Sequence, residues 1–341
     1  MLSERQKLIL SAIVDDYIRS AEPVGSRTIS KRNDVSFSPA TIRNEMSDLE
    51  ELGFLEQPHT SAGRIPSNKG YRYYVDHLIK RGQLSKQELD VIKLFCAERL
   101  DEMERVVQHV AVMLSNMTHY TSIVMGPELL STTLKHLQIV PLNDQSAVAI
   151  IVTNTGHVEN KVVSIPEGVP VSEIERVVNM LNARMAGVPL VHFKSKLYNE
   201  IGVELSRFSH QYEDLVKLIE GVLLNDEDDR IFISGATNML TQPEFRDVIK
   251  VKGIFDLFDE TQTLMRLFST TGQGIQVRIG NENAVEAINN CSLITATYSI
   301  DGQSLGTIGI LGPTRMEYGK VIQLLDVLSQ DMALLLGRWY R

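Results

Sequence analysis

The stretch SPATIRNEMSDLEELGF, residues 38–54, has the marks of a single well-defined helix. Ser38 is a good N-cap, because its hydroxyl can accept a hydrogen bond from a backbone N–H of the first turn. Pro39 then takes the first helical position, where its missing N–H does no harm. Gly53 supplies the stop at the other end. The sequence therefore predicts a helix that begins at Pro39 and ends just before Gly53.

The two faces of this predicted helix differ in chemistry. One face is an apolar stripe for the core, made of Ile42, Met46, Leu49 and Leu52. The acids Asp48, Glu50 and Glu51 fall in the C-terminal half, and recognition helices dock in the major groove by their N-terminal residues. Arg43 can bond a guanine edge and Asn44 an adenine edge. The residues of this helix predicted to contact DNA are Ser38, Pro39, Ala40, Thr41, Arg43, Asn44 and Ser47, with Ser38 and Thr41 placed for phosphates.

Two further helices are predicted before this one. Ser3 and Gln6 have the spacing of a capping box, and apolar residues then recur at helical spacing over residues 4–20. The run EPVG at residues 22–25 breaks that helix. Ser26 can cap a short second helix, SRTISKR, which carries Arg27 as a further candidate DNA contact, and residues 33–37 form the turn.

A β-ribbon is predicted after Gly53. Residues 54–57 are a short strand, residues 58–63 a turn and residues 64–66 a return strand that Pro66 restricts to an edge. Ser67 then caps a helix. The candidate phosphate or minor-groove contacts here are His59, Thr60, Ser61 and Arg64 in the ribbon, and Lys69 and Arg72 on the outward face of the helix. Residues 1–82 are thus predicted to be a winged helix-turn-helix; the alternative is a three-helix protein–protein module with a hairpin.

Charge is divided unevenly along the chain. The whole sequence has a formal net charge of -9, yet residues 1–82 hold twelve Lys or Arg and eleven Asp or Glu, a net charge of +1. The other residues therefore carry -10. Because affinity for phosphates comes from Lys and Arg, a DNA reader of this kind must rely on a few well-placed contacts, doubled by dimerisation, rather than on bulk attraction.

The rest of the chain is predicted to be an α+β body. Residues 83–118 are helical by periodicity. Three antiparallel strands are expected at LKHLQIVPL, SAVAIIVTN and HVENKVVSI, and two more, CSLITATYSI and SLGTIGILG, are joined by the turn signal Asp301-Gly302. Residues 168–268 are mostly helical, GIQVRIG returns the chain to the sheet, and a final apolar-striped helix begins near Thr314.

Three runs carry a resemblance to a known family. LSERQKLILSAIVDDYIRSAEPVGSRTIS, FSPATIRNEMSDLEELGFLEQPHTSAGRIPSNKGYRYYVD and, more loosely, GTIGILGPTRMEY resemble the bacterial heat-inducible transcription repressor HrcA family. The resemblance implies a GAF-like antiparallel sheet domain interrupted by an inserted, mostly helical dimerisation domain. The implied domains are a winged helix-turn-helix at 1–82, a helical linker and the start of the body at 83–118, the GAF-like domain at 119–167 and 269–341, and the dimerising insertion at 168–268.

The same resemblance implies a function and partners. A family member represses chaperone operons of the groE and dnaK type by binding double-stranded DNA at an inverted repeat called CIRCE, loses activity on heat stress and is kept active by the chaperonin GroEL. The expectation of a homodimer also has a physical basis, because one recognition helix reads only a few base pairs and repressors commonly reach useful specificity by pairing two half-sites. We expect the helices of the insertion to form the dimer, with the C-terminal helix stripe as the second choice.

The sequence offers little for other classes of function. The eight His residues form no H-E-x-x-H pattern, Gly272 and Gly274 lack the rest of a dinucleotide motif, and the acidic run at residues 225–229 lacks the spacing of a calcium loop. Cys96 and Cys291 make neither a disulfide framework nor a zinc site, so we expect no catalytic residue, metal or cofactor. No apolar run is long enough for a membrane span, which predicts a cytoplasmic protein. The family resemblance implies in addition a bacterial protein that lies at the nucleoid when it is bound to its operator.

Two alternatives to a heat-labile repressor remain open at this stage. One is a winged-helix regulator whose sheet domain binds a small effector. The other is an enzyme or scaffold with an accessory DNA reader, which would need a constellation of titratable groups in a pocket of the body.

Overall fold

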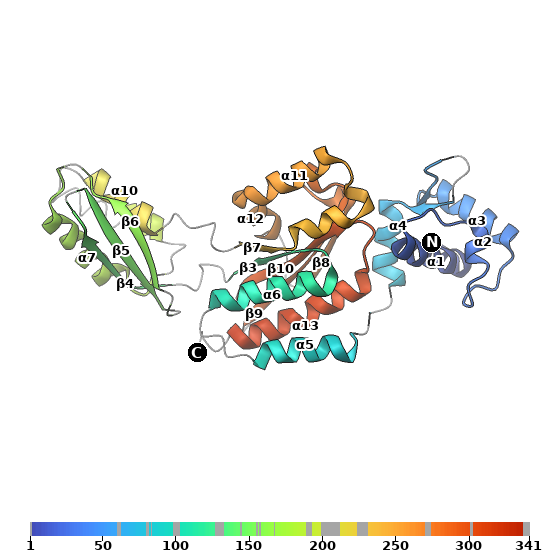
Figure 1. Cartoon of the computed structure of the whole chain (residues 1–341), viewed down its shortest axis with the longest axis horizontal. Coiled ribbons are helices and arrows are strands. Elements are labelled where there is room, and N and C mark those ends of the chain that lie inside the picture. The colour runs from blue at the N-terminus through green and yellow to red at the C-terminus, as the bar shows by residue number, and fades with distance from the viewer. Residues whose placement is uncertain are drawn as a thin grey trace.

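The computed structural model describes residues 2–59, 63–79, 82, 84–97, 103–126, 133–143, 145–154, 156, 158–166, 168–188, 193–198, 212–223, 231–269, 274–300 and 303–336. These form three lobes in a row (Figure 1): the reader domain, residues 2–79, at one end; the body, built by residues 84–126 and 231–336, in the middle; and the lateral lobe, residues 133–223, at the other end.

The reader domain has the predicted order of helices and strands. Its elements are α1 (Glu4–Ser20), α2 (Ser26–Ile29), α3 (Pro39–Glu51), β1 (Leu55–Glu56), β2 (Ile65–Pro66), α4 (Asn68–Tyr73) and a π-helical turn (Tyr74–Leu78). The capping box of Ser3 and Gln6 is formed. One prediction is wrong: Gly25, not Ser26, is the N-cap of α2, and Ser26 is buried as the first helical residue.

The body is a five-stranded antiparallel sheet with helices on both faces. Its strand order is β7-β3-β10-β9-β8, with β7 (Ile231–Ser234), β3 (Thr121–Met125), β10 (Gln303–Pro313), β9 (Cys291–Ile300) and β8 (Ile275–Ile279). The pairing of β9 with β10 confirms the predicted hairpin, although its turn lies outside the described residues. The body helices are α5 (Lys86–Ala97), α6 (Met103–Thr118), α11 (Val248–Asp259), α12 (Thr261–Ser269) and α13 (Tyr318–Leu336), joined by 3-10 turns Ala236–Thr241, Pro243–Phe245, Gly280–Glu282 and Glu286–Ile288.

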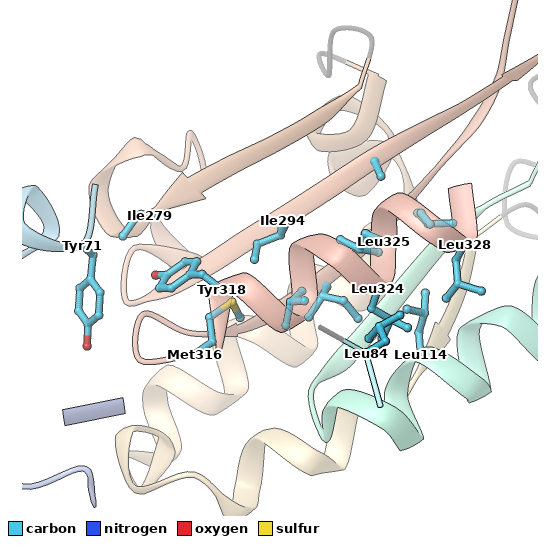
Figure 2. Packing of buried hydrophobic residues seen from close by; sticks show 14 of the residues in the cluster. Tyr71, Leu84, Leu114, Ile279, Ile294, Met316, Tyr318, Leu324, Leu325 and Leu328 are labelled. Atoms are coloured by element: carbon cyan, nitrogen blue, oxygen red, sulfur yellow. The ribbon is translucent and has the colours of Figure 1, made fainter. Parts of the chain in front are cut away.

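Alternation along the strands divides the core of the body into two layers. Ile294 and Ile310 cluster with α6 and α13, whereas their chain neighbours Leu293 and Leu311 cluster with α11 and α12. Figure 2 shows the first layer, in which Leu324, Leu325 and Leu328 of α13 pack near Ile294 and Leu114. The apolar stripe of the C-terminal helix is therefore part of the core and not a free surface.

The lateral lobe has a sheet and a core of its own. Its elements are β4 (Leu134–Pro141), β5 (Ser146–Thr153), β6 (Val158–Ser164), α7 (Val171–Met185), α8 (Phe193–Lys196) and α10 (Tyr212–Leu223). The strand order is β4-β5-β6, and Leu137, Ile151, Leu181, Leu215 and Val222 belong to one buried cluster.

The domain boundaries differ from those predicted at 119–167 and 168–268. The three predicted strands form, but in a separate sheet rather than in the sheet of β9 and β10. Conversely, α11 and α12 were predicted within the excursion and instead pack on the body sheet. The physical reason is that a period of two shows that a strand buries one face, without showing which partner covers it.

Candidate nucleic-acid interface

The first half of α3 presents the predicted polar face to solvent. Ser38 caps the helix, with its Oγ accepting from the Thr41 N–H at 3.1 Å and lying 2.9 Å from Thr41 Oγ1. Thr41 is half-buried, and the other candidates on this helix are exposed: Ser38, Pro39, Ala40, Arg43, Asn44 and Ser47. Behind them Ile42, Met46 and Leu49 are buried against α1 and α2, as predicted.

Two residues of α3 depart from the predicted pattern. Leu52 was placed in the buried stripe, yet it is the C-cap residue and is 48% exposed. Glu45 was not singled out, and it is buried at 7% exposure with its Oε1 2.5 Å from Arg5 Nε of α1. Because this carboxylate is turned inward and paired, it does not oppose a phosphate backbone in front of α3.

The ribbon is anchored to the rest of the reader domain by its return strand. β1 pairs with β2 in antiparallel register, and Arg64 and Val24 exchange both backbone hydrogen bonds at 2.9 Å. A Cβ on Gly63 would lie 2.4 Å from the Val24 carbonyl, so close packing at this position requires glycine. His59 is exposed, whereas Thr60 and Ser61 lie outside the described residues.

The basic candidates fall into two groups. Arg27 on α2 and Lys69 on α4 are exposed. Lys69 Nζ donates to the Leu52 carbonyl at 2.8 Å, where it caps the C-terminal end of α3, and lies 4.6 Å from the centre of the Phe54 ring. Arg64, by contrast, is only 19% exposed, with its Nη2 2.7 Å from Glu50 Oε2.

Arg72 does not face outward as predicted. Its guanidinium turns to the body, where it is bound to Glu282 and donates to the Val277 carbonyl. The sequence could not reveal this contact, because Glu282 lies 210 residues away along the chain.

The shape of this surface suits a major groove. An α-helix with its side chains is about 10–12 Å across, and the major groove of B-DNA is about 12 Å wide. Arg43 offers guanidinium donors and Asn44 both a donor and an acceptor, side by side on an exposed face whose neighbours are small. The arrangement can therefore read base edges, and Ser38 and Thr41 lie at the N-terminal end of the helix.

Other functional classes find no support among the described residues. No group of three or more His, Cys, Asp or Glu in those ranges could hold a metal ion. None of the helices in the described part of the chain is long and apolar enough to cross a membrane. Gly272 and the acidic run at residues 225–229 lie outside it.

Two family models match the chain. One, described as "Winged helix-turn-helix transcription repressor, HrcA DNA-binding", matches residues 1–77. The other, described as "HrcA protein C terminal domain", matches residues 104–322. Together they cover both the reader domain and most of the two remaining lobes.

Curated relatives match over almost the full length. Proteins described as "Heat-inducible transcription repressor HrcA" are 55% identical in Brevibacillus brevis over 98% of both chains, 51% identical in Halalkalibacterium halodurans and 48% identical in Bacillus pumilus, the last two over 100% of this chain and 99% of theirs. A solved structure, described as a hypothetical protein at 2.2 Å resolution, has a TM-score of 0.69 at 22% identity and covers 99% of this chain and 100% of its own, which shows a shared fold.

Proposed function

The chain belongs to the HrcA family of heat-inducible transcription repressors, and from this premise we propose that it represses as a homodimer bound to an inverted-repeat operator. Repression is a role without chemistry on a substrate, so no catalytic residue, cofactor or metal enters the proposal. The observation that carries it is the first half of α3, whose exposed face carries no acid and presents Arg43 and Asn44 over a buried apolar stripe.

The kind of operator is proposed from membership of the family. We expect an inverted repeat of the CIRCE type in front of chaperone operons of the groE and dnaK type, bound in the bacterial cytoplasm at the nucleoid. Two copies of α3 would occupy two half-sites, because a two-fold symmetric repressor matches a two-fold symmetric site. The DNA contacts proposed are Arg27, His59, Lys69 and the candidates at the start of α3, namely Ser38, Pro39, Ala40, Thr41, Arg43, Asn44 and Ser47. Thr60 and Ser61 stay in the proposal from sequence alone. Arg64 and Arg72 are removed from the direct contacts because carboxylates hold them.

The outer face of the lateral sheet is the proposed dimer surface. α7 and α10 cover one face of this sheet. On the other face Val140, Val148 and Val162 lie in register across all three strands, and Val162 is 74% exposed. The outward residues of β5 and β6 carry no charge: Val148, Ile150, Val152, Val158, Asn160 and Val162. A second copy would meet no like charge there, and an exposed apolar patch of this kind is typical of an interface. We therefore propose the lateral sheet as the dimer surface, in place of the helices expected from the sequence.

Heat sensitivity is proposed to follow from the stability of the whole chain rather than from one sensor residue. The free energy of unfolding of a protein is only about 5–15 kcal/mol. Because unfolding is cooperative, the unfolded fraction rises steeply near the midpoint temperature. Unfolded chains expose apolar surface that a chaperonin of the GroEL type would bind and return to the folded state. A small effector has no place in this proposal, since apolar side chains on both faces of the body sheet are covered by helices.

The test uses the purified full-length chain and a fluorescent duplex with an inverted repeat. We expect two chains per duplex, much weaker binding to a single half-site, a negative salt dependence, and release on heating that chaperonin with ATP reverses. Equal affinity for the inverted repeat and for a scrambled duplex of the same length would contradict the proposed function.

A further inference from the structure

Arg72 fastens the reader domain to the body at the edge of the sheet. It projects from α4, and its Nε donates to Glu282 Oε1 at 2.8 Å while Nη2 also binds Glu282 and donates to the Val277 carbonyl at 2.5 Å. Glu282 in turn accepts from the Ile279 N–H at 2.8 Å. Burial opposes ionisation of Glu282, but the bonds from Arg72 and Ile279 lower its pKa. The pair is therefore an ionised, bidentate contact fixed at both ends.

Arg315 fastens a second point of the reader domain. It lies in the turn between β10 and α13, and its Nη1 donates to the Ile18 carbonyl in the last turn of α1 at 2.8 Å. Its other nitrogens are held by the body, with Nε 2.7 Å from Glu244 Oε1 and Nη2 3.0 Å from Gln242 Oε1. The side chain is only 11% exposed. A cation at the C-terminal end of α1 is also favoured by the helix dipole.

The surface between these two arginines is tightly packed. Tyr71 of α4 meets Tyr318 of α13 with ring centroids 5.9 Å apart, and both side chains are buried. Figure 2 shows the two rings at the reader end of the α13 core. A Cβ on Gly280 would lie 2.3 Å from Asn68 Nδ2 at the start of α4, so the two domains approach there as closely as a glycine allows. Two anchored points with a packed surface between them leave little freedom to pivot.

We propose that Arg72 and Arg315 are positioning residues for operator recognition: by fixing the reader domain on the body, they set the separation and angle of the two recognition helices in the dimer. This inference rests on the proposed dimeric function. Neither arginine reads a base. Each determines instead where α3 stands relative to the surface that holds the second copy.

The consequence for DNA follows from the geometry of the duplex. A half-site rotates by about 35° around the axis for each base pair inserted between the two, since a turn takes 10–10.5 base pairs. A reader domain clamped to the body can satisfy only one spacing. A reader domain that pivots on its linker can follow both half-sites through a change of one or two base pairs.

The test measures the dissociation constant for operators whose half-sites are kept and whose spacer is changed by one or two base pairs in either direction. For the wild-type chain we expect the Kd to rise at least tenfold with a change of one base pair. For the double variant Arg72→Gln with Arg315→Gln, we expect weaker binding at the native spacing and Kd values within about threefold of each other across all spacings. The single variants, and the partner variants Glu282→Gln and Glu244→Gln, should fall between the double variant and the wild type. The charge-swapped pair Arg72→Glu with Glu282→Arg should restore part of the discrimination.

Each contrary outcome has a distinct signature. If Arg72 contacts a phosphate directly, Arg72→Gln will lower affinity equally at every spacing and will reduce the slope of log K against log salt by about 0.9. That result would overturn its positioning role. A merely destabilised variant would show a lower unfolding temperature and a uniform loss of active protein, with spacing discrimination intact, which would overturn it too. If the wild-type chain shows no preference for an inverted repeat, the proposed function itself is refuted. If the wild-type chain discriminates between spacings and the variants do so equally well, only the positioning role of Arg72 and Arg315 is refuted.

Discussion

Tyr71 and Tyr318 lie against each other between the reader domain and the body, yet only one of the two hydroxyls is satisfied. Tyr318 Oη donates to the Thr314 carbonyl at 2.6 Å and lies 2.6 Å from Ser292 Oγ. Tyr71 Oη is buried without a hydrogen-bond partner among the described residues. Burial raises the pKa of both tyrosines well above the usual value, so both hydroxyls stay protonated.

The two tyrosines should therefore respond with opposite sign to the loss of the hydroxyl. Tyr71→Phe removes a desolvated, unpaired group, and we expect the free energy of unfolding to rise by about 1 kcal/mol. Tyr318→Phe removes two hydrogen bonds, and we expect it to fall by about 2 kcal/mol. Urea unfolding measures both changes in the free energy of unfolding, provided that its slope against urea concentration stays as in wild type. A destabilised Tyr71→Phe chain would mean that its hydroxyl is satisfied.

Arg43 and Asn44 should govern which bases are read. We expect Arg43→Ala or Asn44→Ala to weaken binding of the operator by about 1–3 kcal/mol each, while binding to nonspecific duplex changes little. Arg43→Lys keeps the charge and loses the bidentate fork, so it should lose specificity with the salt slope unchanged. Competition titrations measure the ratio of the affinity for operator DNA to the affinity for scrambled DNA. If all three variants bind the operator as well as wild type, α3 is not the reading helix.

Two arginines of the reader domain allow a matched test of the phosphate contacts, one as the proposed contact and the other as the control. Arg27 is exposed on α2, whereas Arg64 is held by Glu50. We expect Arg27→Gln to reduce the slope of log K against log salt by about 0.9, because one phosphate contact is lost. Arg64→Gln should weaken binding by loosening the ribbon and leave the slope as in wild type. The opposite pattern of slopes would return Arg64 to the direct contacts.

Cys291 can report whether heat opens the body. Its side chain is fully buried on β9, and burial raises the pKa of the thiol to about 12, so near pH 8 it is both protonated and shielded. In a Cys96→Ser background, we expect alkylation to be slow in the folded chain and to accelerate at the temperature at which operator DNA is released. DNA release while Cys291 stays protected would show that repression ends without opening of this core.

Val162 should be decisive for dimerisation. We expect Val162→Lys to convert the dimer to a monomer and to lower operator affinity at least a hundredfold, because a charge is placed in an apolar contact. Asn179→Lys makes the same change of charge at an exposed position of α7, on the covered side of the sheet, and should leave the dimer intact. Sedimentation velocity distinguishes the two. A dimeric Val162→Lys chain would place the interface elsewhere.

The reader domain could be predicted almost completely because its signals are local. The capping residues Ser3 and Ser38, Pro39 and the stop at Gly53 act within a turn or two of the chain, and the structure places each of them as expected. Apolar periodicity likewise located most strands and helices of the other two lobes.

What the sequence could not supply is the identity of distant partners. β4, β5 and β6 were recognised as strands, but nothing within them states that α7 and α10 rather than α13 cover them. Arg72 has the pattern of an exposed helical charge until Glu282 is seen beside it, and Arg315 went unnoticed because its partners Ile18 and Glu244 come from two other lengths of chain.

The route of the chain into and out of the lateral lobe has an evolutionary meaning. Met125 at the end of β3 and Ile231 at the start of β7 are direct register partners in the body sheet. A short turn could join these two residues into an ordinary hairpin, so the lobe is a graft on a loop position and not a part of the sheet's own architecture. Such a graft can be lengthened, replaced or exchanged between relatives while the host sheet keeps its strand pairing, which lets the lateral lobe and the reader domain diverge at separate rates.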